Sequence, residues 1–304
     1  MNNYTSIKNY YKRILKLYFR LLATKQISFQ SVDSIVFDFS SRIVHIGITD
    51  QLKGLISAFY FSKLRNCDFF VKDDKNNSLT KMGLNTKFLL NNKVDLINPL
   101  KDSVYLNYNH KYKIKKDIIK LTNQAGRIFW FSNNNILEVS IPGNWKYDWH
   151  LLFNELFNLQ MLPQVQYNVG VHVRTAGFFG DFSDSYMNVG NSAYSNKLTL
   201  ISKISDYLKS LNLPKNKIYF CSDSIILCNS LSEFATVNPN WAVDGSISHS
   251  TNGNIQDLDN LIYDWNNLVV SKEIISLVNE NFYNGVFPLY CSLIKMVNFK
   301  KVEI

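Results

Sequence analysis

Residues 169–185 bring a histidine, an arginine and two carboxylates together behind a short apolar run. The run alternates valine with other residues and ends by presenting His172 and Arg174, and a Gly-containing loop with Asp181 and Asp184 follows. The planar fork of an arginine gives a phosphate two parallel charge-assisted hydrogen bonds, and a nearby carboxylate can take a proton from an incoming hydroxyl. The spacing therefore predicts a phosphate-binding loop, although an arginine at the end of a strand is also a common salt-bridge partner.

Short polar side chains follow two other apolar segments. Ser222 and Asp223 come directly after the run 218–221, where they could hydrogen-bond a nucleobase or ribose, or cap the next helix. Asp50 and Gln51 come after a Gly-containing turn, where they could line a ligand cleft or cap the helix that follows. Both pairs stand behind expected strands, at the edge where α/β sheets bind ligands. We therefore treat all four as candidate site residues.

Alternating strand and helix patterns must position these side chains. Runs rich in β-branched residues predict strands, and apolar residues spaced by three and four predict helices. The expected strands are 34–39, 42–48, 126–131, 167–173 and 218–221, and the expected helices are 51–64, 148–159 and 195–211. Residues 72–120 predict loops with one or two strands, and apolar segments at 259–268 and 268–275 precede helical residues near the C-terminus. This alternation is typical of an α/β protein, with two halves joined near 160–166 and a ligand cleft between them.

The composition bounds the function more loosely. The chain has 304 residues, of which 46% are hydrophobic, and a formal net charge of +9. It can therefore bury a substantial core, and its charge suits nucleic acid, an anionic membrane or a phosphorylated substrate. The four cysteines and five histidines are scattered, which favours reduced thiols and argues against a metal site. No apolar run reaches the length of a membrane span.

The first 32 residues carry basic side chains and no acidic ones. At helical spacing, apolar residues fall on one side, while Lys12, Lys16 and Arg20 fall on the other. This pattern is typical of an amphipathic helix lying on an anionic bilayer. It is also compatible with a helix docked on the protein with a basic outer face.

Two of these segments resemble motifs of known fucosyltransferases. Residues 47–52 are similar to the Gly-Leu-Gly-Asn-Gln-Leu opening of bacterial α-1,2-fucosyltransferases. His172-Val-Arg174 followed by Thr175 resembles the His-x-Arg-Arg signature of the wider superfamily, which includes the α-1,6- and protein O-fucosyltransferases. Thr175 stands in place of the second arginine.

Two further segments continue the resemblance in the family's order. Residues 220–223 (Phe-Cys-Ser-Asp) look like the strand of that family that ends in Ser-Asp. Residues 268–282 and 284–287 look like its last motif, an apolar run that leads to a Ser/Thr-rich turn, with Asn-Glu-Asn at 279–281 in place of the hydroxyl residues. The ordered set spans residues 42–295.

The resemblance implies a GT-B fold, in which two Rossmann-like domains face each other across a cleft. It implies inverting transfer from a GDP-sugar, with no metal and no other cofactor. Arg174 would bind the donor diphosphate and stabilise the departing GDP, and Asp181, the sixth residue after Thr175, would activate the acceptor hydroxyl. The implied donor-binding residues are His172, Arg174, Thr175, Ser222, Asp223, Asn281 and Phe282, and the implied cleft residues of the N-terminal domain are Gly47, Asp50 and Gln51.

We expect a basic amphipathic helix over 1–32, a Rossmann-like acceptor-side domain over 33–162 and a Rossmann-like GDP-sugar-binding domain over 163–304. The predicted reaction moves fucose from GDP-fucose to a hydroxyl of a bacterial surface-glycan precursor, an oligosaccharide or lipid-linked glycan of the O-antigen or capsule kind. The predicted location is the cytoplasm, with peripheral attachment to the inner membrane through the basic helix. The alternatives are transfer of another GDP-deoxyhexose and, in a different class, a non-enzymatic basic protein that binds nucleic acid.

Overall fold

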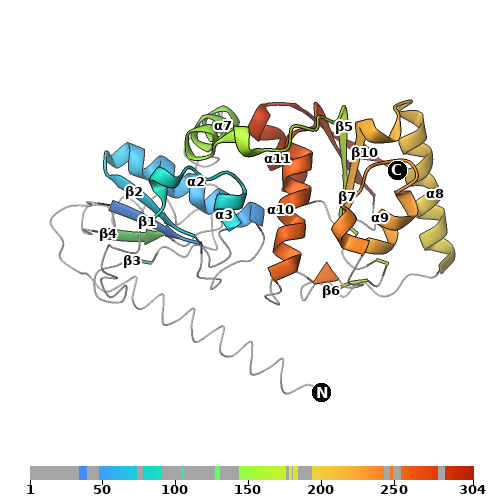
Figure 1. Cartoon of the computed structure of the whole chain (residues 1–304), viewed down its shortest axis with the longest axis horizontal. Coiled ribbons are helices and arrows are strands. Elements are labelled where there is room, and N and C mark those ends of the chain that lie inside the picture. Colours follow the sequence, from blue (N-terminus) through green and yellow to red (C-terminus); the bar gives the residue numbers. More distant parts are fainter. Residues whose placement is uncertain are drawn as a thin grey trace, which may run out of the picture. The chain divides into compact units, whose positions relative to one another are not determined.

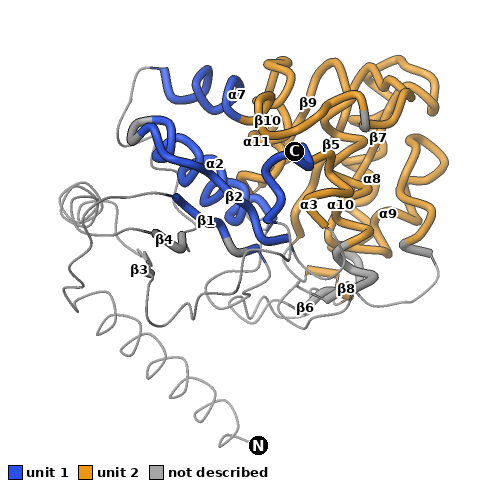
Figure 2. Tube along the Cα trace, turned by 60° about the vertical axis from the view of Figure 1, so that its left-hand side comes forward, with its two compact units in different colours: residues 1–75, 85–152 blue, residues 76–84, 153–304 orange. Residues whose placement is uncertain are grey.

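The computed structural model describes residues 34–39, 48–73, 78–90, 104–105, 127–130, 144–175, 178–179, 181–183, 194–242, 247–248, 255–279 and 285–304. Within these ranges the protein is a mixed α/β structure in which all strands paired into sheets run parallel. The chain divides into two compact units (Figure 2): unit 1 is residues 1–75 and 85–152, and unit 2 is residues 76–84 and 153–304. The division after residue 152 falls inside helix α7 (Trp145–Leu156), ten residues before the boundary expected at 162.

Unit 1 contains one parallel sheet with the strand order β2-β1-β4-β3. These strands span, in chain order, Ser34–Asp38 (β1), Asp68–Lys72 (β2), Val104–Tyr105 (β3) and Arg127–Trp130 (β4). Helix α2 (Ile48–Arg65) packs on the sheet and buries apolar residues at helical spacing: Leu52, Leu55, Ile56 and Phe59. A 3₁₀ turn at Thr86–Phe88 follows β2. The strands predicted at 34–39 and 126–131 are confirmed.

Helix α2 begins before the predicted start at residue 51. Ile48 and Thr49 are helical and buried, although the β-branched residues of 42–48 predict a strand that ends at Ile48. Burial in the core outweighs the small difference in helix propensity of such residues. The rest of that predicted strand lies outside the described residues, as does the whole N-terminal segment 1–32.

Unit 2 contains a second parallel sheet, with the strand order β10-β9-β5-β7. Its strands are β5 (Val169–Val173), β7 (Ile218–Ser222), β9 (Glu273–Val278) and β10 (Asn298–Glu303). Its main helices are α8 (Tyr194–Ser210), α9 (Ile225–Leu231), α10 (Ile255–Val269) and α11 (Phe287–Lys295). Shorter elements are α3 (Ser78–Lys81), β6 (Phe182–Ser183), β8 (Ile247–Ser248), and 3₁₀ turns at Leu159–Met161, Lys215–Lys217 and Pro239–Ala242.

Helices cover both faces of the unit 2 sheet, with α8 and α9 on one side of the strands and α10 on the other (Figure 1). Alternate strand residues point to opposite faces, so Val171 and Phe220 pack with α8 and α9. Gly170 points the other way, toward α10, where a Cβ atom would lie 2.7 Å from the Ser271 hydroxyl and 2.8 Å from Leu268. The lack of a side chain at Gly170 therefore allows α10 to approach β5 closely.

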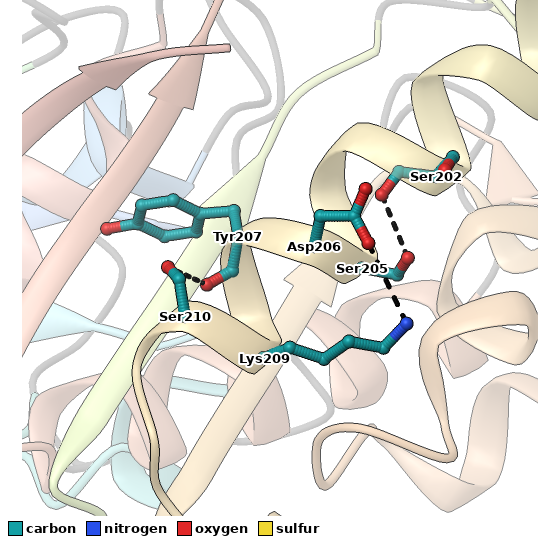
Figure 3. Close-up of polar contacts among 6 residues, drawn as sticks. All are labelled: Ser202, Ser205, Asp206, Tyr207, Lys209 and Ser210. Carbon is teal, nitrogen blue, oxygen red and sulfur yellow. Dashed lines mark hydrogen bonds and ion pairs between the residues drawn. The ribbon is translucent and has the colours of Figure 1, made fainter.

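Two serines of α8 bond to carbonyl groups of their own helix (Figure 3). The Ser205 hydroxyl donates to the Ser202 carbonyl at 2.8 Å, and the Ser210 hydroxyl donates to the Tyr207 carbonyl at 2.7 Å. Such bonds satisfy the hydroxyls without a tertiary partner. The predicted helix at 195–211 is confirmed; most of its apolar residues are buried or half-buried, whereas Leu198 is exposed and Ser205 is buried.

Other sequence predictions agree with the structure in type and differ at the ends. The strands expected at 167–173 and 218–221 correspond to β5 and β7, and the helix expected at 148–159 corresponds to α7. Strand β10 was not predicted, because Lys300 and Lys301 interrupt its apolar pattern at the edge of the sheet. Charged residues are common on edge strands, where they discourage pairing with other chains.

All four cysteines lie in the described ranges, and each is a free thiol. Burial raises the pKa of the Cys221, Cys228 and Cys291 thiols well above the usual range, which keeps them protonated and unreactive. Among the described helices, none is long and apolar enough to cross a membrane.

Candidate functional site

The strand order of unit 2 creates a switch point at the carboxyl edge of its sheet. From β5 the chain continues to β7 on one side, and from β9 it continues to β10 on the other. Open α/β sheets bind ligands beside neighbouring strands whose connections leave in opposite directions. Arg174 is the first residue after β5, and its side chain is half-buried. The predicted phosphate-binding arginine thus lies where this type of sheet binds ligands.

Asp223, the first residue after β7, is bonded to the residue that follows Arg174. Asp223 Oδ1 accepts hydrogen bonds from the Thr175 backbone N–H at 2.6 Å and from the Thr175 hydroxyl at 2.9 Å. The Ser222 hydroxyl donates to the same oxygen at 3.4 Å, and Thr175 is fully buried. The structure brings these three predicted donor-binding residues together, where they bond to one another.

Asp181 contacts the beginning of helix α9. Its Oδ2 accepts hydrogen bonds from the Ser224 hydroxyl at 2.8 Å and from the Ile226 backbone N–H at 2.9 Å. Its Oδ1 is buried and makes no hydrogen bond. Ser224 is the N-cap of α9, and its hydroxyl oxygen accepts from the Leu227 N–H at 3.1 Å. Because side-chain oxygens stabilise the unpaired N–H groups of a first helical turn, these contacts give Asp181 a capping role, which differs from the role of a base expected from the sequence.

Further contacts hold the loop after β5 between Thr175 and Asp181. The Phe178 N–H donates to the Thr175 carbonyl at 3.0 Å, and the Phe178 and Phe179 side chains are buried in the core beside α8. The Lys197 ammonium donates to the Phe179 carbonyl at 2.9 Å. The backbone around Arg174 is therefore held by buried apolar contacts and by side-chain hydrogen bonds.

His172 precedes Arg174 by two residues and lies on the face of the sheet that α10 and α11 cover. The residue is only 8% exposed, and its ring lies 5.5 Å from that of Phe287 between centroids. Burial, and secondly the positive charge of Arg174, lower the pKa of His172 from 6.5 to about 3. The imidazole is therefore neutral at physiological pH. Its buried Nδ1 has no hydrogen-bond partner.

The predicted residues outside this cluster fall into two groups. Asn281, Phe282 and Gly47 lie outside the described residues. Asp50 and Gln51 belong to unit 1 and stand in the first turn of α2. The Asp50 carboxylate accepts a hydrogen bond from the Lys53 ammonium at 2.7 Å.

Two residues of this edge are not among the predicted site residues. Ser224 caps α9 and bonds to Asp181, and a serine directly before an apolar run is a helix-start signal. Phe287 packs on His172 and, edge-on, on Trp265 at 5.5 Å. No local pattern indicates that contact, because it joins strands and helices far apart in the sequence.

The comparisons with known proteins add no assignment. No protein-family model matches the sequence, and no curated protein matches it. In the part of the chain that the structure describes, no group of three or more His, Cys, Asp or Glu side chains is placed to hold a metal ion. Fold and site together define an α/β protein whose second unit carries a half-buried arginine and linked polar side chains at the switch point of a parallel sheet.

Proposed function

We propose that the protein is a glycosyltransferase that uses a GDP-sugar donor, with GDP-fucose as the first candidate and another GDP-linked deoxyhexose as the alternative. Unit 2 holds the nucleotide, and the acceptor is a hydroxyl of a bacterial surface-glycan precursor. The observation that carries the proposal is the position of Arg174, directly behind β5 at the switch point of the sheet. The ordered fucosyltransferase-like motifs of the sequence supply the choice of donor.

In this proposal Arg174 stabilises the diphosphate as the glycosidic bond lengthens. Negative charge accumulates on the leaving GDP at that moment, so a fixed guanidinium lowers the barrier more than it strengthens ground-state binding. The neutral imidazole of His172 adds no competing positive charge beside it. An arginine can hold two phosphate oxygens at once, which a lysine cannot reproduce.

The donor class is tested by thermal unfolding of the purified protein with GDP, UDP, GDP-fucose and UDP-glucose. We expect the guanine nucleotides alone to raise the unfolding midpoint, because a ligand that binds only the folded state stabilises it. Arg174→Ala should remove the shift, and Arg174→Lys should restore only part of it. Lys203→Ala, at an exposed position of α8, is the matched control. Stabilisation by UDP and not by GDP would refute the proposal.

The identity of the base is a separate question, because the Asp181 contacts are those of a helix cap. Asp181→Asn should lower the unfolding midpoint, since a neutral amide oxygen accepts these two hydrogen bonds more weakly than a charged carboxylate oxygen does. If Asp181 is also the base, sugar transfer should be lost even at temperatures where the variant is fully folded. Retained transfer in the folded variant would assign the base elsewhere.

A further inference from the structure

The bond between Asp223 and Thr175 joins the ends of two neighbouring strands. One carboxylate oxygen accepts both donors of Thr175, the backbone N–H at 2.6 Å and the hydroxyl at 2.9 Å. Thr175 is completely buried, so a ligand at this edge does not reach its hydroxyl. Hydrogen bonds to an ionised acceptor are the stronger kind. This contact therefore holds the start of the loop after β5 in one arrangement.

The geometry of the peptide group transmits this restraint to Arg174. The Cα atom of Arg174 and the N–H group of Thr175 belong to the same planar peptide unit. An acceptor that fixes the direction of that N–H also restrains the peptide plane after the Arg174 Cα, while strand β5, which ends at Val173, restrains the plane before it. Together the two planes set the direction in which the side chain departs. A charged group of a binding site needs such support, because a small misplacement weakens its contact with the ligand.

We propose that Asp223 is a positioning residue that aims Arg174 at the donor diphosphate through Thr175, and that it does not bind the guanine or ribose. This inference rests on the proposed function, since it presumes that Arg174 binds a diphosphate. It replaces the nucleotide contact that the sequence suggested for Asp223 and Ser222. It also explains why a threonine suits position 175, because its hydroxyl bonds to Asp223 inside the protein.

The two roles of Asp223 are distinguished by a ligand that lacks the base and the ribose. Binding of GDP and of inorganic pyrophosphate is measured by calorimetry for the wild type, Asp223→Ala, Thr175→Val and Thr175→Ser. Asp206→Asn and Thr236→Val are matched controls: Asp206 lies on the exposed face of α8, and the Thr236 hydroxyl bonds only to the Lys215 carbonyl among the described residues.

A positioning role predicts that Asp223→Ala weakens GDP and pyrophosphate by the same factor, about tenfold, because a charge-assisted contact to the loop is lost. Thr175→Val should weaken both by a smaller common factor, and Thr175→Ser, which keeps the hydroxyl, should bind both as the wild type does. In an Arg174→Ala background the Asp223→Ala change should have no further effect, since residues acting through one group are not additive.

A direct nucleotide contact predicts a different pattern and would overturn the inference: Asp223→Ala would weaken GDP and leave pyrophosphate unchanged. Equal binding in all variants would overturn it as well, as would a wild type that binds GDP without binding pyrophosphate. If the wild type binds neither ligand, the proposed function fails instead. Hydrogen exchange at the Thr175 amide of the free protein then tests whether Asp223 restrains this N–H group. Protection that persists in Asp223→Ala contradicts the restraint.

Discussion

The two faces of the unit 2 sheet are built from different chemistry. The buried core of the face under α8 and α9 is apolar, with Val171, Phe220 and Leu277 among its residues. The face under α10 carries a buried polar pair, in which the Tyr219 hydroxyl donates to Asp264 Oδ1 at 2.6 Å. Apolar contacts stabilise in proportion to area and have little direction, whereas a buried hydrogen bond stabilises only in one geometry.

This difference assigns separate tasks to the two faces. Helix α10 carries the buried polar residues Asn260, Asp264 and Asn267, and Asp264 bonds to Tyr219 of β7. The helix cannot slide along β7 without breaking this bond and leaving buried polar groups unpaired. His172 lies on the same face, two residues before Arg174. The apolar core under α8 and α9 therefore stabilises the unit without defining a direction, and the Tyr219–Asp264 bond fixes the position of α10 against β7.

The largest effect should come from the apolar face. Phe220→Ala removes a fully buried ring and should lower the free energy of unfolding by about 3–5 kcal/mol, measured by urea denaturation. Phe299→Ala, at a half-buried position of the edge strand β10, is the control and should cost much less. A Phe220 variant no less stable than the Phe299 variant would contradict the division of tasks.

The polar face should respond to the loss of a single oxygen atom. Tyr219→Phe keeps the ring and leaves the buried Asp264 with one hydrogen bond fewer, which should lower the free energy of unfolding by about 1.5–3 kcal/mol. Tyr147→Phe, at an exposed position of α7, should have no measurable effect. Burial and, secondly, the Asp264 carboxylate raise the pKa of Tyr219, so the same variant should also be less sensitive to alkaline pH than the wild type. An unchanged stability would mean that this hydrogen bond does not hold α10 in place.

The sequence predicted the apolar face better than the polar one, and the reason is physical. Alternating valines at 169–173 and the apolar spacing of α8 are local patterns, and they identified β5 and its covering helix. The partners Thr175 and Asp223 lie far apart in the chain and meet through the parallel pairing of β5 with β7, whereas Tyr219 and Asp264 meet through the packing of α10 on β7. Their residue types indicated hydrogen-bonding groups at a strand end, but the fold decides whether these groups bond to a ligand or to another side chain.

Acid should destabilise the polar face through His172. Its pKa is about 3 in the folded protein and 6.5 in the unfolded chain, so between these values the unfolded chain binds more protons. The contribution of His172 to the free energy of unfolding is therefore fully present above pH 6.5 and is lost as the pH drops toward 3. Between pH 7 and pH 5 the loss is about 2 kcal/mol. His172→Gln should lose this part of the slope in urea denaturation measured across that range. His150→Gln, at a half-buried position of α7, should keep the pH dependence of the wild type.

The smallest effect is expected where polar chemistry is exposed to water. Lys209 and Asp206 form an ion pair at 3.7 Å on the outer face of α8 (Figure 3), with 57% and 70% of their side chains exposed. A double-mutant cycle with Lys209→Ala and Asp206→Ala should give a coupling of at most about 0.5 kcal/mol that disappears at high salt. The Tyr219–Asp264 pair also joins a hydrogen-bond donor to an aspartate carboxylate, but it is enclosed by the sheet and α10. A coupling on α8 as large as the loss in Tyr219→Phe would show that burial is not what makes the polar face of the sheet specific.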